Sequence, residues 1–300
     1  MNVVFKVNDK IKEKMIEYYK DLKRDKEIPY VVFQAVDNDT VVTLYESGKV
    51  MFQGTSADVD ASMWQEMMGI TEKEQIDYSK YKYSTSVGSD EVGTGDYFGP
   101  IIVTAAYVKK EDVEELISLG VGDSKKIDDE KILKIAPILA KKLKYKSIIL
   151  TNEEYNEKYS KNNNMNKIKA IMHNKVLYKL MNEEKITNLD YIIVDEFARE
   201  NRYYEYIKES KNIQRGITFM TKAEDKNLAV ASASIISRYI FLKEFDKLSD
   251  NLGIPLPKGA GKEVDKIGEE VVEKYGEDKL KEIAKLNFKN TERILHTMIF

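Results

Sequence analysis

Pairs of adjacent acidic residues recur beside apolar segments of this chain. Three of these pairs are Asp90-Glu91, Asp195-Glu196 and Glu224-Asp225. Groups at the borders of strands and helices gather at one edge of an α/β sheet, where functional side chains collect. Carboxylates brought together there repel one another unless cations neutralise them. The pairs therefore suggest a site for divalent metal, with the carboxylate ligands that Mg²⁺ and Mn²⁺ prefer.

The segment GSDEVGTGDYFG around the first pair allows other interpretations. An isolated Asp-Glu pair is most often only a polar turn. Gly88 and Gly93 have the spacing of a phosphate-binding loop, but Thr94 stands where that loop needs lysine. Gly93, Gly95 and Gly99 miss the dinucleotide-binding spacing by one residue, and a strand-like IIVTAAYV follows where a helix is required. A polar turn and a metal site, with glycines that let a substrate come close, remain as alternatives.

Composition restricts the kind of site that 300 residues can build here. The chain has no cysteine and two histidines, so a catalytic metal would be held by carboxylates, which favours magnesium or manganese over zinc. The net charge of −3 argues against a globally basic nucleic-acid binder and leaves only local patches. The N-terminus lacks an export signal and no apolar run reaches membrane-spanning length, so we expect a soluble, cytoplasmic protein with no membrane partner. Nothing in the sequence requires a protein partner, and we expect a monomer.

Residues 1–70 predict a small separate domain. VVFKV predicts a strand, 9–23 carries apolar residues at helical spacing, and YVVFQAV, TVVTLYE and KVMFQG predict three more strands. A last helix is expected near 56–68. Its expected core residues are Trp64, Met67 and Met68. A β-α-β-β-β-α order with both helices on one face would leave the other face of the sheet open.

The polar segment 71–86 is expected to be a linker. Over 87–300 the sequence pattern changes to predicted strands that alternate with helices. Strands are predicted at 87–90, 100–108, 145–151, 190–195 and 216–221. Helices are predicted at 111–119, 129–143, 164–183, 199–210, 225–249 and 262–285. Strands interleaved with helices predict an α/β domain whose sheet is at least partly parallel.

The motif GSDEVGTGDYFGP resembles the opening motif of the type 2 and type 3 ribonucleases H. The likeness continues in order through GVGDSKKI, the acid of IIVDEF, KAEDKNLAVASASIISR, PKGAG and KLNFKNT, and covers essentially all of 87–300. Type 2 enzymes typically carry Gly-Arg-Gly where this chain has GTG at 93–95, which favours the type 3 family, ribonuclease HIII. The first domain also resembles the TATA-box-binding-protein-like domain of that type, most clearly in YESGKVMFQG.

The resemblance implies a ribonuclease H-like catalytic domain, a mixed sheet flanked by helices, with four catalytic acids that hold two divalent ions, Mg²⁺ or Mn²⁺. The acids map to Asp90, Glu91, Asp195 and Glu224. Alignment through AVASASII puts Glu224 at the fourth position, and Asp225 stays the alternative. The implied activity is endonucleolytic hydrolysis of the RNA strand of an RNA–DNA hybrid by a two-metal-ion mechanism, which leaves 5′-phosphate and 3′-hydroxyl ends.

The resemblance also suggests contacts with the hybrid substrate. The expected substrate-binding residues are Gly93, Thr94, Gly95, Lys125, Lys126 and Lys49. Backbone groups of the first three would contact 2′-hydroxyls, the feature that separates RNA from DNA. The two lysines of DSKK would offer point charges to a phosphate, or else be solvated charges where a helix begins. Lys49 would lie with Tyr45 on the open face of the first sheet.

Two further residues are expected to stay outside the site. Glu196 should point away from Asp195, because neighbouring side chains leaving a strand face opposite ways. His173 lies in an amphipathic segment and is interpreted as structural. Two rival functions remain: type 2 specificity for a single ribonucleotide in duplex DNA, and a hybrid-binding module without catalysis. The acids argue against the second, because a pure binder would gain from losing negative charge near phosphates.

Overall fold

The computed structural model describes residues 2–24, 28–37, 40–54, 57–68, 78–122, 127–160 and 163–297. The chain divides into two compact units, 1–77 and 78–300. Of the segment 71–86, which the sequence predicts to be a linker, 71–77 lies outside the described residues. Its described part belongs to the second unit, where it contains a short helix and the first residue of a strand.

The first unit is one antiparallel sheet with two helices, and the predicted order β-α-β-β-β-α is confirmed. Its elements are β1 (Asn2–Lys6), α1 (Asp9–Tyr18), the 3₁₀ turn η1 (Lys20–Leu22), β2 (Val31–Asp37), β3 (Thr40–Tyr45), β4 (Lys49–Gly54) and α2 (Ala57–Met67). The sheet order is β1-β4-β3-β2. Asn8 begins α1 by accepting a hydrogen bond from the Ile11 amide, as a good N-cap does.

One face of this sheet packs on both helices. Phe33, Val42 and other alternate strand residues are buried in a cluster with residues of α1 and α2, including Trp64, whose indole N–H donates to the Tyr19 hydroxyl at 3.0 Å. The prediction that Met67 belongs to the core is wrong: its residue is 52% exposed, because the last turn of α2 extends beyond the contact made by Trp64. Lys49 is on the other face of this sheet, because successive side chains of a strand point to opposite faces. Its ammonium lies 6.0 Å from the ring centre of Tyr45.

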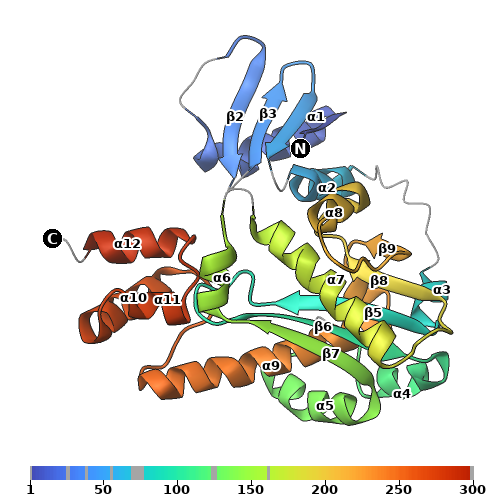
Figure 1. Ribbon diagram of the computed structural model, residues 1–300. Coiled ribbons are helices and arrows are strands. Elements are labelled where there is room, and N and C mark those ends of the chain that lie inside the picture. The colour runs from blue at the N-terminus through green and yellow to red at the C-terminus, as the bar shows by residue number, and fades with distance from the viewer. Residues whose placement is uncertain are drawn as a thin grey trace. The chain divides into compact units, whose positions relative to one another are not determined.

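The second unit is a mixed five-stranded sheet with helices on both faces, as predicted (Figure 1). Its strands are β5 (Ser86–Val92), β6 (Ile101–Val108), β7 (Lys144–Leu150), β8 (Tyr191–Asp195) and β9 (Ile217–Met220). Its helices and 3₁₀ turns are α3 (Ser79–Lys82), η2 (Lys110–Asp112), α4 (Val113–Ser118), α5 (Asp129–Lys142), α6 (Asn152–Lys158), α7 (Met165–Glu183), α8 (Glu200–Ile207), η4 (Ala223–Asp225), α9 (Leu228–Leu252), α10 (Lys262–Tyr275), α11 (Lys279–Ile283) and α12 (Lys289–Thr297). The sheet order is β7-β6-β5-β8-β9, with β5, β8 and β9 parallel and β6 and β7 antiparallel to their neighbours.

Two departures from the predicted helices have local causes. The predicted helix 262–285 is two helices, because Gly276 adopts a φ of 84° and ends α10. Helix α6 was not predicted, although Thr151 and Glu154 form a reciprocal capping box at its start.

The central strand β5 is sandwiched between α9 and α7. A Cβ placed on Gly88 would lie 2.3 Å from the backbone nitrogen of Val230, so α9 approaches β5 more closely than any other residue type would allow. On the other face, Val87 packs in a cluster with Ala170 and Val176 of α7. Successive residues of β5 therefore face α7 and α9 in turn.

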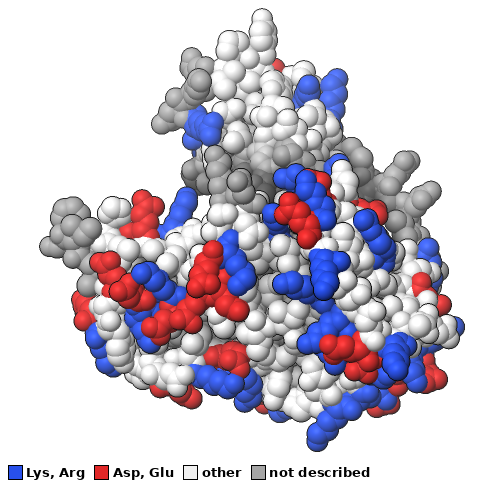
Figure 2. Space-filling view, in the orientation of Figure 1, with Lys and Arg blue, Asp and Glu red and all other residues white. Residues whose placement is uncertain are grey.

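Charged side chains of both signs are interspersed over the visible surface of the second unit, among uncharged areas (Figure 2). Within the described residues, no helix combines the length and apolar character that a membrane crossing requires.

A buried lysine holds the turn that follows β5. Lys285 is fully buried, and its ammonium donates to the backbone carbonyls of Asp96 at 2.8 Å and Gly99 at 2.5 Å. The Asn152 amide donates to the same Gly99 carbonyl at 2.9 Å. Burial lowers the pKa of Lys285 to about 7, and the charge of Asp96 opposes that shift only in part.

Replacing Lys285 with Met should destabilise the protein by about 1–3 kcal/mol, because the Asp96 carbonyl loses its ammonium donor and the buried Gly99 carbonyl keeps only Asn152. The unfolded chain, whose lysine keeps a pKa of about 10.4, binds more protons than the folded chain above pH 7. The wild-type free energy of unfolding should therefore rise between pH 7 and 10, and the variant should lack that contribution. Denaturant unfolding across this range checks both effects, with Lys281→Met as the exposed control. Parallel pH profiles for the wild type and Lys285→Met would contradict the assignment.

Candidate active site

The four predicted acids lie at one edge of the mixed sheet. Asp90 and Glu91 are near the carboxyl end of β5, and Asp195 is the last residue of β8, the parallel neighbour of β5. Glu224 lies in η4, directly after β9, which is the next parallel strand. The carboxyl ends of three consecutive parallel strands therefore bring the acids to the same edge, as open α/β sheets do for their ligands.

Asp90 faces α9 and is surrounded by negative charge. Burial and the charges of Glu91 and Asp195 together raise the pKa of Asp90 to about 8, although a hydrogen bond with Ser234 of α9 opposes the rise. Ser237, one turn further along α9, donates to the backbone carbonyl of Asp90 at 3.2 Å. The helix thus fixes this carboxyl group without neutralising it.

Glu91 faces the other way, toward α7. Its Oε1 forms an ion pair with Lys169, and its Oε2 accepts a hydrogen bond from Nε2 of His173 at 2.9 Å. Burial by itself would raise the pKa of Glu91, but the hydrogen bond from His173 and the charges of His173 and Lys169 lower it to about 2. The two adjacent acids therefore have opposite electrostatic environments.

The interpretation of His173 as a purely structural residue missed its contact with Glu91, and Lys169 was not singled out at all. Lys169 and His173 are four residues apart and share one face of α7. A charged residue on the apolar face of KIKAIMHNK could therefore have indicated a buried partner. What the sequence could not supply was the partner, because α7 and Glu91 are about eighty residues apart.

Asp195 and Glu224 are linked through the backbone of η4. The Asp195 carboxylate accepts a hydrogen bond from the Ala223 amide at 2.9 Å, which places the following residue beside it. Burial raises the pKa of Glu224, and the charges of Asp195 and Asp225 add to that rise. Glu224 is half-buried, whereas Asp225 is exposed, and Glu196 beside Asp195 is also exposed.

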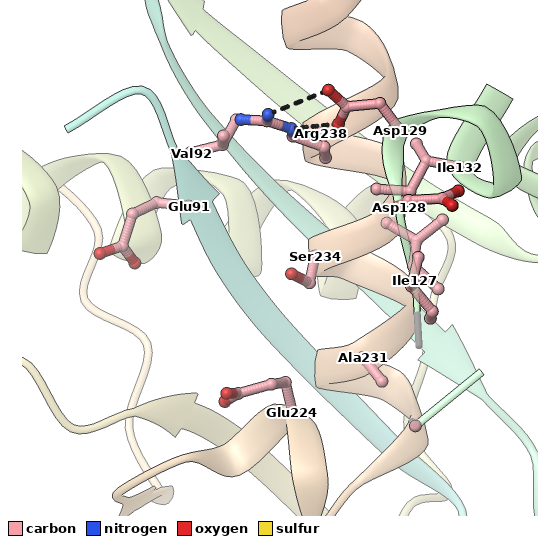
Figure 3. Close-up of a pocket in the computed structure, with 12 residues that line it drawn as sticks. Glu91, Val92, Ile127, Asp128, Asp129, Ile132, Glu224, Ala231, Ser234 and Arg238 are labelled. Carbon is pink, nitrogen blue, oxygen red and sulfur yellow. Dashed lines mark hydrogen bonds and ion pairs between the residues drawn. The ribbon is translucent and has the colours of Figure 1, made fainter. Parts of the chain in front are cut away.

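A cavity of about 530 Å³ opens beside these acids (Figure 3). Its wall includes Glu91, Glu224 and Ser234, with Ser234 to the right of Glu91 and above Glu224 in the view (Figure 3). At the far end the Arg238 guanidinium pairs with Asp129 at 3.0 Å, and Lys258 pairs with the same carboxylate at 2.6 Å. The remaining lining residues are Val92, Gly122, Ile127, Asp128, Ile132, Ala231 and Ile235.

The four acids have the ligand chemistry that divalent metal ions prefer, but their side chains do not converge on one point. Among the described residues, no group of three or more histidine, aspartate and glutamate side chains is arranged to hold an ion. In the same part of the chain, no lysine or arginine forms an ion pair with Asp90, Asp195 or Glu224. Their mutual repulsion would be relieved by a cation, whereas both oxygens of Glu91 already have partners on α7.

The predicted substrate residues are only partly placed. Gly93 has a φ of 89° and a Cβ there would lie 2.1 Å from the carbonyl of Pro100, so the turn itself requires glycine. Gly95 is exposed, with open space around the position of a Cβ, and Thr94 between them is half-buried. Lys125 and Lys126 lie outside the described residues. Lys49 belongs to the first unit, where it is exposed.

Comparisons with known proteins cover both units. A family model described as Ribonuclease HII matches residues 87–291, and one described as a domain of unknown function, DUF3378, matches residues 2–75. A protein of Bacillus cereus (strain ATCC 14579) named Ribonuclease HIII is 41% identical over 307 residues, with 99% of each chain covered.

Two solved structures extend the likeness to the fold. Bst-RNase HIII in complex with Mn²⁺ is 35% identical, with a TM-score of 0.72 and 99% of each chain covered. Aquifex aeolicus RNase H3 is 25% identical, with a TM-score of 0.56, and the match covers 95% of this chain and 99% of that one. This chain therefore belongs to the ribonuclease HIII family of ribonuclease H endonucleases.

Proposed function

We propose that this protein cleaves the RNA strand of RNA–DNA hybrids by a two-metal-ion mechanism that leaves 5′-phosphate and 3′-hydroxyl ends. The observation that carries the proposal is the meeting of acids at the carboxyl ends of β5, β8 and β9, where burial and like charges raise the pKa of Asp90. The family relationship and the Mn²⁺ complex of Bst-RNase HIII support divalent ions as the missing positive charge.

Asp90, Glu91, Asp195 and Glu224 would hold the ions, Mg²⁺ or Mn²⁺. When bound, two divalent ions supply an activated water and neutralise charge on the leaving 3′-oxygen. The charges of both Glu91 and Asp195 act on Asp90, so we expect that its carboxylate would help to hold both ions. Ser234 and the backbone contact from α9 keep that carboxyl group in place. The chain needs no nucleophile of its own.

Recognition of RNA would come from the turn after β5. Gly95 is exposed and a side chain is missing there, so backbone groups of this turn can approach a ribose and contact 2′-hydroxyls. The four-stranded sheet of the first domain, proposed to span 1–70, would give a second binding surface that includes Lys49 and Tyr45.

Cleavage of three labelled substrates tests the proposal: a full RNA–DNA hybrid, a chimera with four ribonucleotides and a duplex with one ribonucleotide. We expect cleavage of the first two in Mg²⁺ or Mn²⁺, none in EDTA, and poor cleavage of the third. Each lost 2′-hydroxyl contact removes a hydrogen bond worth about 0.5–1.5 kcal/mol, so kcat/KM should fall about 10- to 1,000-fold for the third. Metal-independent cleavage would contradict the mechanism, and equal rates on the last two substrates would favour type 2 specificity.

Asp90→Asn should lower kcat by more than about 1,000-fold, because the shared ligand of both ions is lost. The same change should raise the thermal unfolding temperature in EDTA, since it removes one of several repelling charges. Glu196→Gln, beside Asp195 but exposed, is the matched control and should change neither quantity. Activity of Asp90→Asn within tenfold of the wild type would rule out the shared position.

Glu224→Gln should cost about 100-fold or more in kcat, and Asp225→Asn much less. The reason is that Glu224 is half-buried beside Asp195 and lines the cavity, whereas Asp225 is exposed. Single-turnover cleavage of the hybrid compares the two variants directly. A reversed order would make Asp225 the fourth acid.

Lys49→Ala should weaken hybrid binding and reduce the slope of log Kd against log salt by about 1, as expected for one lost phosphate contact. Lys14→Ala on the exposed side of α1 is the control and should leave the slope unchanged. Binding is measured in Ca²⁺ at several salt concentrations. Equal slopes for the two variants would place the nucleic-acid surface elsewhere.

A further inference from the structure

Helix α7 directs two side chains at a single carboxylate. Lys169 and His173 are four residues apart and therefore share one face of the helix. Lys169 forms an ion pair with Oε1 of Glu91, and His173 Nε2 donates to Oε2 at 2.9 Å. Both oxygens of a proposed metal ligand are thus held from the side opposite to α9.

His173 is fixed in its position. Its Nδ1 lies 2.8 Å from the Ser89 hydroxyl, and its ring stacks on Phe197 with centroids 5.3 Å apart. The side chain is 0% exposed. Moving the imidazole would break the hydrogen bonds on both ring nitrogens, so its hold on Glu91 is a permanent part of the fold.

Lys169 is held less completely. Its side chain is 11% exposed, and apart from Glu91 its ammonium contacts the face of Phe197, 4.2 Å from the ring centre. A lysine carries a compact charge on a flexible four-carbon chain and can move that charge without disturbing its backbone. The ammonium can therefore leave Oε1 while His173 remains.

The Lys169 ammonium occupies the position at Oε1 of Glu91 that a metal ion bound to this oxygen would need. A divalent ion and an ammonium on the same carboxylate oxygen repel each other, so they compete for Oε1. We propose that Lys169 is a displaceable counter-cation, which neutralises Glu91 until a divalent metal ion replaces it, while His173 keeps the carboxylate oriented. The proposal rests on the proposed function only in taking Glu91 as a metal ligand.

Binding of Mn²⁺ to Lys169→Met without nucleic acid tests this role. Removal of the competitor should tighten Mn²⁺ binding, followed by electron paramagnetic resonance, by about tenfold or more. In EDTA the variant should unfold at a lower temperature than the wild type, because Glu91 loses its counter-charge, and saturating Mn²⁺ should shrink that difference. Lys175→Met, an exposed lysine of the same helix, is the matched control and should match the wild type in both measurements.

Amine labelling of the wild type gives an independent measurement, which decides the matter if Lys169→Met does not fold. Displacement predicts that Mn²⁺ speeds acetylation of Lys169, read by mass spectrometry, and leaves Lys175 unchanged. Unchanged or weaker Mn²⁺ binding by the variant, or labelling of Lys169 that Mn²⁺ does not speed, would overturn the proposal. A wild type that cleaves no hybrid in any divalent metal would instead contradict the proposed function, so the two failures are distinguishable.

Discussion

The concentration of negative charge at the carboxyl end of β5 is the constraint on which the rest of the catalytic domain depends. Asp90 and Glu91 are adjacent on one strand, so they face opposite layers of the fold. Each layer answers differently: α9 offers hydroxyl groups to Asp90, whereas α7 offers an ammonium and an imidazole to Glu91. Asp90 therefore has no positively charged partner among the described residues, whereas both oxygens of Glu91 have partners on α7.

The different surroundings of Asp90 and Glu91 depend on how closely α9 and α7 approach β5. The contact of Gly88 with the backbone of Val230 brings α9 near enough for its serines to reach Asp90. On the other face, Ser89 lies beside His173, whose ring then reaches Glu91. A larger residue at Gly88 would push α9 outward and separate Asp90 from Ser234, so a packing requirement and an electrostatic one coincide in four consecutive residues.

The strands and the position of the acids at strand ends could be predicted from the sequence, for a physical reason. Runs such as IIVTAAYV and YIIVD are rich in residues that favour buried strands, and all five predicted strands of the second unit are present. Acids at strand ends are local signals, and parallel pairing of β5, β8 and β9 gathers them without further information. The resemblance of the motifs to the ribonucleases H supplied the catalytic roles of the acids, which the periodicity of the sequence could not supply.

What the sequence could not supply were contacts between distant segments. Lys169 and His173 meet Glu91 only because α7 crosses β5, and no local pattern encodes that crossing. The choice between Glu224 and Asp225 depends on one 3₁₀ turn, which follows Lys222 in a left-handed conformation with a φ of 51° and directs the first acid toward Asp195. Gly276 was visible in the sequence, but glycine within a helical pattern is often tolerated, so its positive φ emerged only in the fold.

The contrast between the two adjacent acids has a consequence for how the site can bind cations. A pocket in which every carboxylate lacked a partner would be costly to fold, because uncompensated buried charge is strongly unfavourable. Pairing Glu91 with Lys169 and His173 removes part of that cost, while Asp90, Asp195 and Glu224 retain the repulsion that a divalent ion would relieve in the proposed mechanism. Affinity for metal and stability without it make opposite demands on the same acids, and the two faces of β5 allow one protein to meet both.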